Sequence, residues 1–237
     1  MKKILGILLF GLMGVSLLAR DVLYVGTNAE FAPFEYMENG KIVGFDIDLI
    51  NKIGEKIDKE IKIKNIAFDG LLPALQTNKI DLIIAGMTVT KEREKFVDFS
   101  NDYFIANQVI IVPENENTIV DINSLKNKKV GVVLGYTGDL IVSKIEGVNK
   151  IQYNSAPSSI MALTGGKIDA MILDSAPAQS YIAKNQGLKI IELDSEVEKY
   201  AIAVGKNNKD LINKINIALE EIKREGIYDK LIIKYFN

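Results

Sequence analysis

Short apolar runs that alternate with amphipathic stretches constrain the fold of this chain more than any other feature. Residues 22–26, 61–66 and 82–85 are predicted strands, and the last of them is an unbroken aliphatic run. Strands buried on both faces are typical of parallel sheets that helices cover. Between the first two strands, apolar residues recur at helical spacing over residues 49–57, and Asp46 is placed to cap that helix. The alternation predicts an α/β fold.

A second set of elements with the same alternation begins near residue 108. We expect strands at residues 109–112, 129–133, 169–173 and 189–191, and helices at residues 138–145, 158–164 and 176–185. A strand over residues 200–204 and an amphipathic helix over residues 211–222 follow. No segment rich in proline, glycine or serine separates the two sets. The sequence therefore predicts two similar halves without a flexible linker.

The run DLIIAGMTVTKER at residues 81–93 carries polar groups at the end of a predicted buried strand. Gly86 allows close approach of the backbone, and Thr88 and Thr90 present hydroxyls on one face of an extended chain. Arg93 offers a planar fork that binds a carboxylate through two parallel hydrogen bonds. This run is equipped to hold a small zwitterion. Alternatively, Thr90 caps a short helix whose Glu92 and Arg93 face the solvent.

Three segments in a fixed order give this run a family context. They are VLYVGTNAEFAPFEY at residues 22–36, KIVGFDIDLINKI at residues 41–53, and the stretch from FDGLLPAL to SNDYF at residues 68–104. The ordered set resembles the polar amino-acid substrate-binding proteins of bacterial ABC importers, solute-binding protein family 3, from about residue 22 to the C-terminus.

The resemblance implies an α/β type II periplasmic binding protein fold with two lobes. Each lobe is expected to be a mixed sheet flanked by helices, and two crossover strands act as the hinge. Lobe 1 would comprise residues 20–105 and 200–237, and lobe 2 residues 106–199. The crossings are then expected near residues 105–108 and 198–201.

The resemblance also implies a set of ligand-binding residues. Aromatic rings at Phe31 and Phe68 would cover the ligand side chain, whereas Phe34 is expected to be core. Gly86, Thr88 and Arg93 would receive the ammonium and carboxylate groups. The predicted site comprises Asn28, Glu30, Phe31, Phe68, Gly86, Met87, Thr88, Arg93, Leu134, Thr137 and Asp174.

Two members of this set come from the second half of the chain, and each has a structural alternative. In VGVVLGYTGD at residues 130–139, backbone N–H groups and the Thr137 hydroxyl would bind the ligand carboxylate. Asp174, at the end of a buried strand, would pair with the ligand ammonium. Either residue could instead serve only as the cap of the helix that follows it. If both bind ligand, a zwitterion is bracketed from opposite lobes.

Two departures from the family pattern leave the identity of the ligand side chain undecided. Asn28 stands where many relatives have aspartate, and Val133 stands where some have lysine or glutamine. The acids Glu30, Glu35 and Asp69 remain nearby in sequence, although each could be a solvated loop acid. We expect a basic or neutral polar L-amino acid, with a slight preference for arginine or lysine.

Composition removes several classes of chemistry. The chain has no cysteine and no histidine, which excludes disulfides, thiolate nucleophiles, histidine-containing triads and imidazole-bound zinc. With 29 basic and 31 acidic residues it has no electrostatic footprint for nucleic acid. With these classes excluded, the resemblance implies a non-catalytic monomer without cofactor or metal that delivers its ligand to a membrane permease. The alternatives are a small-acid dehydratase with Glu30 as general acid or base, and a ligand-sensing domain.

The first nineteen residues follow the plan of a secretory signal peptide. Lys2 and Lys3 precede an apolar stretch that ends near residue 18, and Ala19 is small. The apolar stretch is short for a membrane span. Leu17 is an imperfect residue for the position two before the cut, so an uncleaved anchor is the alternative. We expect removal of residues 1–19 and a protein located in the periplasm or otherwise outside the cytoplasmic membrane.

Overall fold

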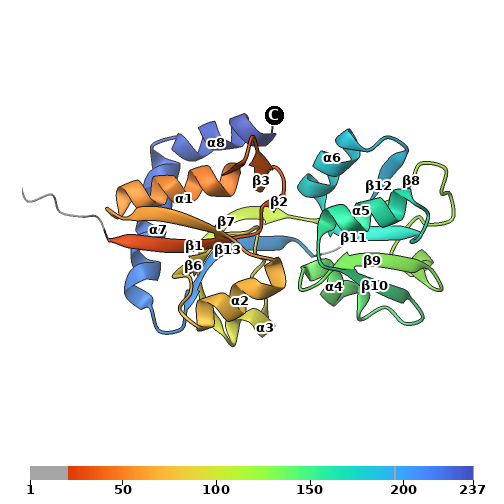
Figure 1. The fold of residues 1–237 in the computed structure, drawn as a ribbon, viewed down its shortest axis with the longest axis horizontal. Helices are drawn as coiled ribbons and strands as arrows, with labels where there is room; N and C mark the ends of the chain where they lie inside the picture. The colour runs from red at the N-terminus through yellow and green to blue at the C-terminus, as the bar shows by residue number, and fades with distance from the viewer. Residues whose placement is uncertain (1–20, 195, 237) are drawn as a thin grey trace, which may run out of the picture.

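Two α/β lobes lie side by side in the computed structural model, which describes residues 21–194 and 196–236 (Figure 1). The predicted signal segment, residues 1–19, lies outside the described residues. Each lobe has one five-stranded mixed sheet with helices packed on it. This architecture confirms the predicted two-lobe α/β fold. None of the helices within the described ranges is both long and apolar enough to cross a bilayer.

The sheet of lobe 1 has the strand order β5-β1-β6-β13-β7. Its strands are β1 (Val22–Thr27), β5 (Glu60–Asn65), β6 (Leu82–Ile83), β7 (Val97–Ala106) and β13 (Glu198–Gly205). Strands β5 and β6 run parallel to β1, whereas β13 runs antiparallel to both of its neighbours. The carboxyl ends of β1 and β6 therefore open at one edge, where α/β sheets place ligands.

Helices α1 (Phe45–Lys56), α2 (Phe68–Gln76), α3 (Lys91–Glu94), α7 (Lys209–Arg224) and α8 (Ile227–Phe236) belong to the same lobe. A small antiparallel sheet of β2 (Glu30–Phe31), β3 (Glu35–Glu38) and β4 (Lys41–Val43) precedes α1. Phe34 is fully buried and packs edge-on against Phe45, which agrees with its predicted core role.

The expected capping role of Asp46 is wrong. Gly44 is the N-cap of α1, and a side chain at Gly44 would collide with the carbonyl of Phe34. Asp46 lies in the first turn, fully buried, and its Oδ2 accepts hydrogen bonds from the Gly86 N–H (2.9 Å) and the Tyr103 hydroxyl (2.7 Å). The carboxylate therefore anchors the loop after β6 instead of the helix end.

The sheet of lobe 2 has the order β10-β9-β11-β8-β12. Its strands are β8 (Gln108–Pro113), β9 (Lys129–Val133), β10 (Asn149–Tyr153), β11 (Ala170–Asp174) and β12 (Leu188–Glu192). Helices α4 (Thr137–Val142), α5 (Ala156–Thr164) and α6 (Ser175–Lys184) and the 3-10 turn η1 (Asn123–Leu125) accompany them. Strands β9, β10 and β11 are parallel and β8 is antiparallel to β11, which gives the expected mixed sheet.

Two neighbouring connections join the lobes. The chain leaves the first sheet after Ala106 and enters the second at Gln108, so that Asn107 alone separates the two strands. It returns between the end of β12 at Glu192 and the start of β13 at Glu198. Glu198 pairs with Ala106, which places both connections side by side. Adjacent strands of this kind form a hinge about which two lobes can rotate.

Candidate functional site

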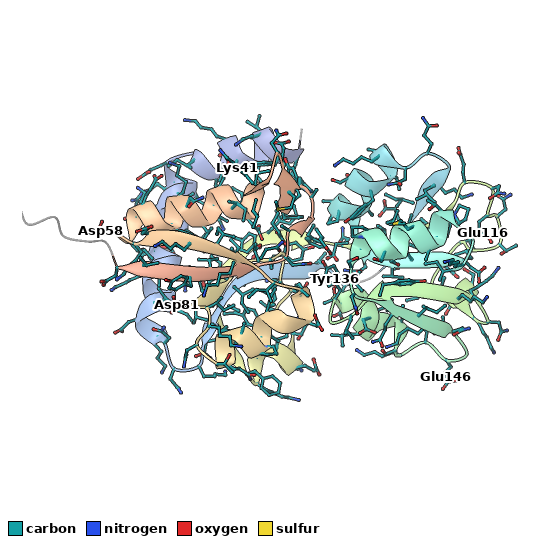
Figure 2. The ribbon with its side chains drawn as sticks, in the orientation of Figure 1. Lys41, Asp58, Asp81, Glu116, Tyr136 and Glu146 are labelled. Atoms are coloured by element: carbon teal, nitrogen blue, oxygen red, sulfur yellow. The ribbon has the colours of Figure 1, made fainter. Side chains whose placement is uncertain are left out.

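A small cavity lies between the lobes, at the carboxyl ends of β6 and β11. Its volume is about 10 Å³, roughly the room for one water molecule. The residues that line it are Phe31, Phe68, Gly86, Thr88, Arg93, Tyr136, Thr137 and Asp174. Tyr136 lies where the two lobes meet (Figure 2).

Arg93 contributes a buried positive charge from lobe 1. Thr90 caps α3 by accepting a hydrogen bond from the Arg93 N–H (3.2 Å), but the Arg93 side chain is only 6% exposed, so the alternative that it faces solvent is wrong. Its guanidinium donates to the carbonyls of Thr88 (2.6 Å) and, across the cleft, Gly135 (3.0 Å). Burial lowers the pKa of Arg93 to about 10, so it stays charged at neutral pH.

Asp174 contributes a buried acid from lobe 2. It stands at the N-cap position of α6, yet its side chain makes no capping hydrogen bond. Instead its Oδ1 accepts from the hydroxyl of Tyr200 (2.5 Å) on β13. Burial first, and then the nearby carboxylate of Glu198, raise the pKa of Asp174 to about 7. The alternative that Asp174 only caps α6 is therefore wrong, because its carboxyl group bonds to Tyr200 and not to the helix end.

The hydroxyls of Thr88 and Thr137 meet on one carboxylate. Glu198 Oε2 accepts from Thr88 (2.5 Å) and from Thr137 (2.9 Å), and Gln108 donates to the Thr137 hydroxyl (3.0 Å). The N-cap of α4 is Tyr136, so Thr137 does not cap that helix through its side chain. Hydroxyls from both lobes are thus aimed into the same small space.

Gly86 is required at its position because of the Phe31 ring. Its φ of +52° is in the left-handed region, and a side chain there would lie 2.5 Å from Phe31. Phe68 packs on the other side of the site, 5.2 Å from the Arg93 guanidinium carbon. The Phe31 ring is 3% exposed and the Phe68 ring 9%.

Seven of the eleven predicted site residues line the cavity: Phe31, Phe68, Gly86, Thr88, Arg93, Thr137 and Asp174. Asn28 is buried one contact away and accepts a hydrogen bond from Tyr136. Met87 and Leu134 are not among the lining residues, and their backbone groups bond to Ala201 and Tyr153. Their predicted roles in binding are not supported by contact with this cavity.

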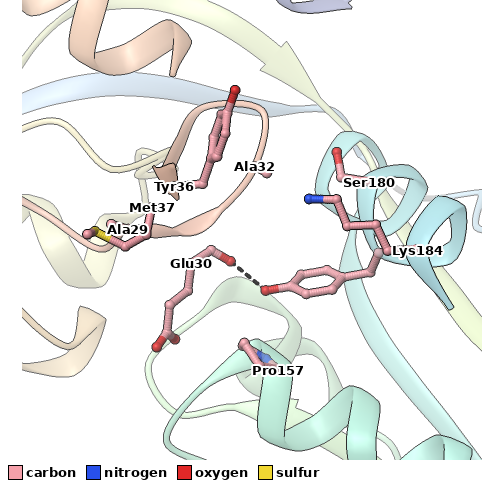
Figure 3. Close-up of a pocket in the computed structure, with 9 residues that line it drawn as sticks. Ala29, Glu30, Ala32, Tyr36, Met37, Pro157, Ser180 and Lys184 are labelled. Carbon is pink, nitrogen blue, oxygen red and sulfur yellow. Dashed lines mark hydrogen bonds between the residues drawn. The ribbon is translucent and has the colours of Figure 1, made fainter. Parts of the chain in front are cut away.

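Glu30 lines a different pocket, of about 200 Å³, at the outer mouth between the lobes (Figure 3). Its carbonyl accepts a hydrogen bond from the Tyr181 hydroxyl (2.7 Å), which joins the two lobes. Figure 3 shows its carboxylate and the Lys184 ammonium well separated in this pocket. Partial burial raises the pKa of Glu30.

Tyr136, Glu198 and Tyr200 were not predicted. Tyr136 lies within the VGVVLGYTGD segment, but the direction of its ring depends on the facing lobe. Glu198 and Tyr200 lie in the expected second crossing, which pointed to the hinge and not to the site. Over the described ranges, no cluster of acids could hold a metal ion.

The geometry agrees with the comparisons to known proteins. The model of the bacterial extracellular solute-binding proteins, family 3, matches residues 23–237. The chain is 37% identical over 219 residues to a probable histidine-binding protein of Neisseria gonorrhoeae, covering 90% of this chain and 82% of the relative.

Solved structures of an ancestral arginine-binding protein, one with arginine bound and one with glutamine bound, each share 45% identity with this chain. Each superposes with a TM-score of 0.89 and covers 92% of this chain and 99% of its own. This chain therefore belongs to the bacterial extracellular solute-binding proteins of family 3.

Proposed function

We propose that this protein binds an L-amino acid between its lobes, outside the cytoplasmic membrane, and delivers it to an ABC importer. One observation carries the proposal. Arg93 and Asp174 approach the same cavity from opposite lobes, both are at least 94% buried, and no ion pair satisfies either one within the described part of the chain. An unpaired buried charge is costly. The carboxylate and ammonium of an α-amino acid supply both missing partners.

The side chain of the ligand belongs to the basic or neutral polar class, with a slight preference for arginine or lysine. Relatives named for histidine and arginine support the basic group, and the glutamine complex of the ancestral protein supports the neutral one. Asn28, a neutral amide beside the site, can serve either. The partners are a membrane permease and no other macromolecule, and the protein acts as a monomer.

We favour binding without catalysis over a dehydratase. The dehydratase candidate, Glu30, places its carboxylate in the outer pocket and does not line the enclosed cavity. A general acid or base must come within hydrogen-bond reach of the substrate. A substrate that lacks an amine would also have no use for a second buried acid, Asp174, opposite Arg93.

Calorimetry against the twenty L-amino acids tests this function. Arg93→Ala should weaken binding of the best ligand by about 2–5 kcal/mol, roughly 30-fold to several thousandfold, because the ligand carboxylate loses its main partner in a desolvated site. Arg93→Lys should also bind weakly, since an ammonium cannot reproduce the fork. Arg224→Ala, at the exposed end of α7, is the matched control and should bind as the wild type does.

Two results would contradict the proposal. One is the absence of measurable binding by any of the twenty amino acids. The other is wild-type affinity in a folded Arg93→Ala variant with an unchanged melting temperature, which would show that the buried guanidinium does not hold the ligand.

A further inference from the structure

The ring of Tyr136 crosses the cleft and enters lobe 1. It belongs to the loop between β9 and α4 of lobe 2, yet its nearest aromatic neighbours are Phe68 and Phe31 of lobe 1. The ring centroids lie 4.6 Å from Phe68 and 5.4 Å from Phe31, and both contacts are edge-on. These are the two rings expected to cover a ligand side chain. Tyr136 therefore occupies the place where that side chain would lie.

A hydrogen bond fixes the ring in this position. The Tyr136 hydroxyl donates to Asn28 Oδ1 at 2.9 Å, and both residues are buried. At the base of the side chain, the Tyr136 N–H donates to the carbonyl of Val133 (3.1 Å). A ligand that displaces the ring must break the Asn28 bond and two aromatic contacts.

The remaining space is too small for a long side chain. With the carboxylate of the ligand at Arg93 and its ammonium at Asp174, the side chain points toward the remaining walls, which Phe31, Phe68 and Tyr136 provide. The cavity volume of about 10 Å³ holds about one water molecule, so any amino acid, alanine included, must part the walls of the cavity to enter. A long side chain must in addition move the Tyr136 ring, because that ring contacts both Phe31 and Phe68.

We infer that Tyr136 penalises long side chains, so that a short side chain binds with the ring in place and a longer one, that of arginine or lysine included, binds only after the ring leaves. This inference rests on the proposed function, because it names which amino acids that site prefers. It concerns the length of the ligand side chain and is independent of its charge.

A homologous series of ligands separates length from charge. Alanine, 2-aminobutyrate, norvaline and norleucine differ by one methylene each, and their affinities can be measured by calorimetry or by displacement of the best ligand found in the screen. We compare wild type with Tyr136→Ser, which removes the ring, and Tyr136→Phe, which keeps it. Tyr181→Phe is the matched control, since it removes another hydroxyl that joins the lobes, outside the cavity.

In the wild type, affinity should not increase from alanine to norleucine. In Tyr136→Ser it should increase about fourfold for each added methylene, about 60-fold in all, since burial of one methylene contributes about 0.8 kcal/mol. Tyr136→Phe and Tyr181→Phe should keep the wild-type ratio of norleucine to alanine affinity within threefold. Circular dichroism checks that each variant is folded, and Tyr136→Thr replaces the serine variant if that variant is not.

A ratio in Tyr136→Ser that rises less than tenfold over wild type overturns the inference. So does an equal rise in Tyr136→Phe, because the hydroxyl and not the ring would then control length. If wild type and variants bind some amino acid but the ratio does not move, the inference alone fails. If no amino acid binds any of them, the proposed function fails and this inference fails with it.

Discussion

At the scale of single residues, the site combines two buried groups of opposite charge with few partners of their own. Arg93 has five N–H donors, and its guanidinium uses two of the groups on backbone carbonyls. Asp174 accepts hydrogen bonds from Tyr200 and from the side chain of Gln108. The other N–H groups of Arg93 and the charge of Asp174 can serve a ligand whose ends carry the complementary charges.

Ligand affinity should depend on pH through Asp174. In the closed form without ligand its pKa is raised to about 7, chiefly by burial and then by Glu198, and an ammonium beside it lowers that pKa again. Binding to this form below pH 7 therefore releases a proton, and its affinity should fall by up to tenfold per pH unit from pH 7 to pH 5. Arg93 stays charged across this range.

Calorimetry of wild type and Asp174→Asn over pH 5–8 checks this dependence. The asparagine variant should bind more weakly at pH 8 and show little change with pH, because it has no carboxyl group to titrate. A wild-type affinity that is constant from pH 5 to pH 8 would show that Asp174 is already ionised in the free protein.

At the scale of elements, two buried acids, Asp46 and Glu35, lie beneath the loop that follows β6 and carries Gly86. Asp46, from the first turn of α1, accepts the Gly86 N–H, and Glu35, from β3, is fully buried near it. Burial and then the charge of Asp46 raise the pKa of Glu35 well above its ordinary value. Burial also raises the pKa of Asp46, to about 6. At neutral pH the pair retains a proton that the unfolded chain would lose.

This pair should make the protein less stable as pH rises. An acid whose folded pKa is raised binds its proton more tightly in the folded state, so its stabilisation is complete below the unfolded pKa and is lost as pH rises toward the folded one. Urea unfolding of Glu35→Gln should show a stability close to wild type at pH 4 and higher by about 1–3 kcal/mol at pH 8. Glu38→Gln, at an exposed acid of the same strand, is the control. Equal pH slopes for wild type and Glu35→Gln would contradict the shared proton.

Elements with strong apolar runs were predictable from sequence. The predicted strand at residues 129–133 is β9, and the helix at residues 176–185 is displaced by one residue from α6. The long strand β7 was not predicted, because its burial is irregular and its pairing with β13 shifts register twice. The short strands β2 to β4 depend on one another for pairing, and their sequence carries little alternation.

The candidate site also contains residues that were predicted from the sequence and residues that were not. Arg93 and Asp174 follow predicted strands, and the resemblance to the family assigned both residues to the ligand. Tyr136 and Glu198 act through contacts that cross between lobes or lie at the hinge, to Phe68 and Asn28 in one case and to Thr88 and Thr137 in the other. Such contacts depend on how the lobes face each other, which a single sequence does not indicate.

At the scale of the whole molecule, the lobes are closed on one another. Among the described residues, and apart from the bonds that the hinge strand β13 makes to Asp174 and Thr137, three hydrogen bonds cross the cleft: Arg93 to the Gly135 carbonyl, Tyr136 to Asn28, and Tyr181 to the Glu30 carbonyl. Closure also removes Arg93 and Asp174 from water, and neither gains an ion partner from the part of the chain that the structure describes. The desolvation of two charges amounts to several kcal/mol, which opposes the gain from three hydrogen bonds of about 1 kcal/mol each.

Ligand should therefore shift the protein from an open to a closed form. Without ligand, the cost of burying Arg93 and Asp174 favours rotation about the hinge at Asn107 and Glu198, which readmits water to both charges. A bound amino acid pairs with both and removes that cost.

Small-angle scattering should give a larger radius of gyration for the free protein than for the protein saturated with its best ligand. If the free wild type already has the smaller radius, the three cross-lobe hydrogen bonds outweigh the desolvation of the two charges, and the ligand binds without moving the lobes.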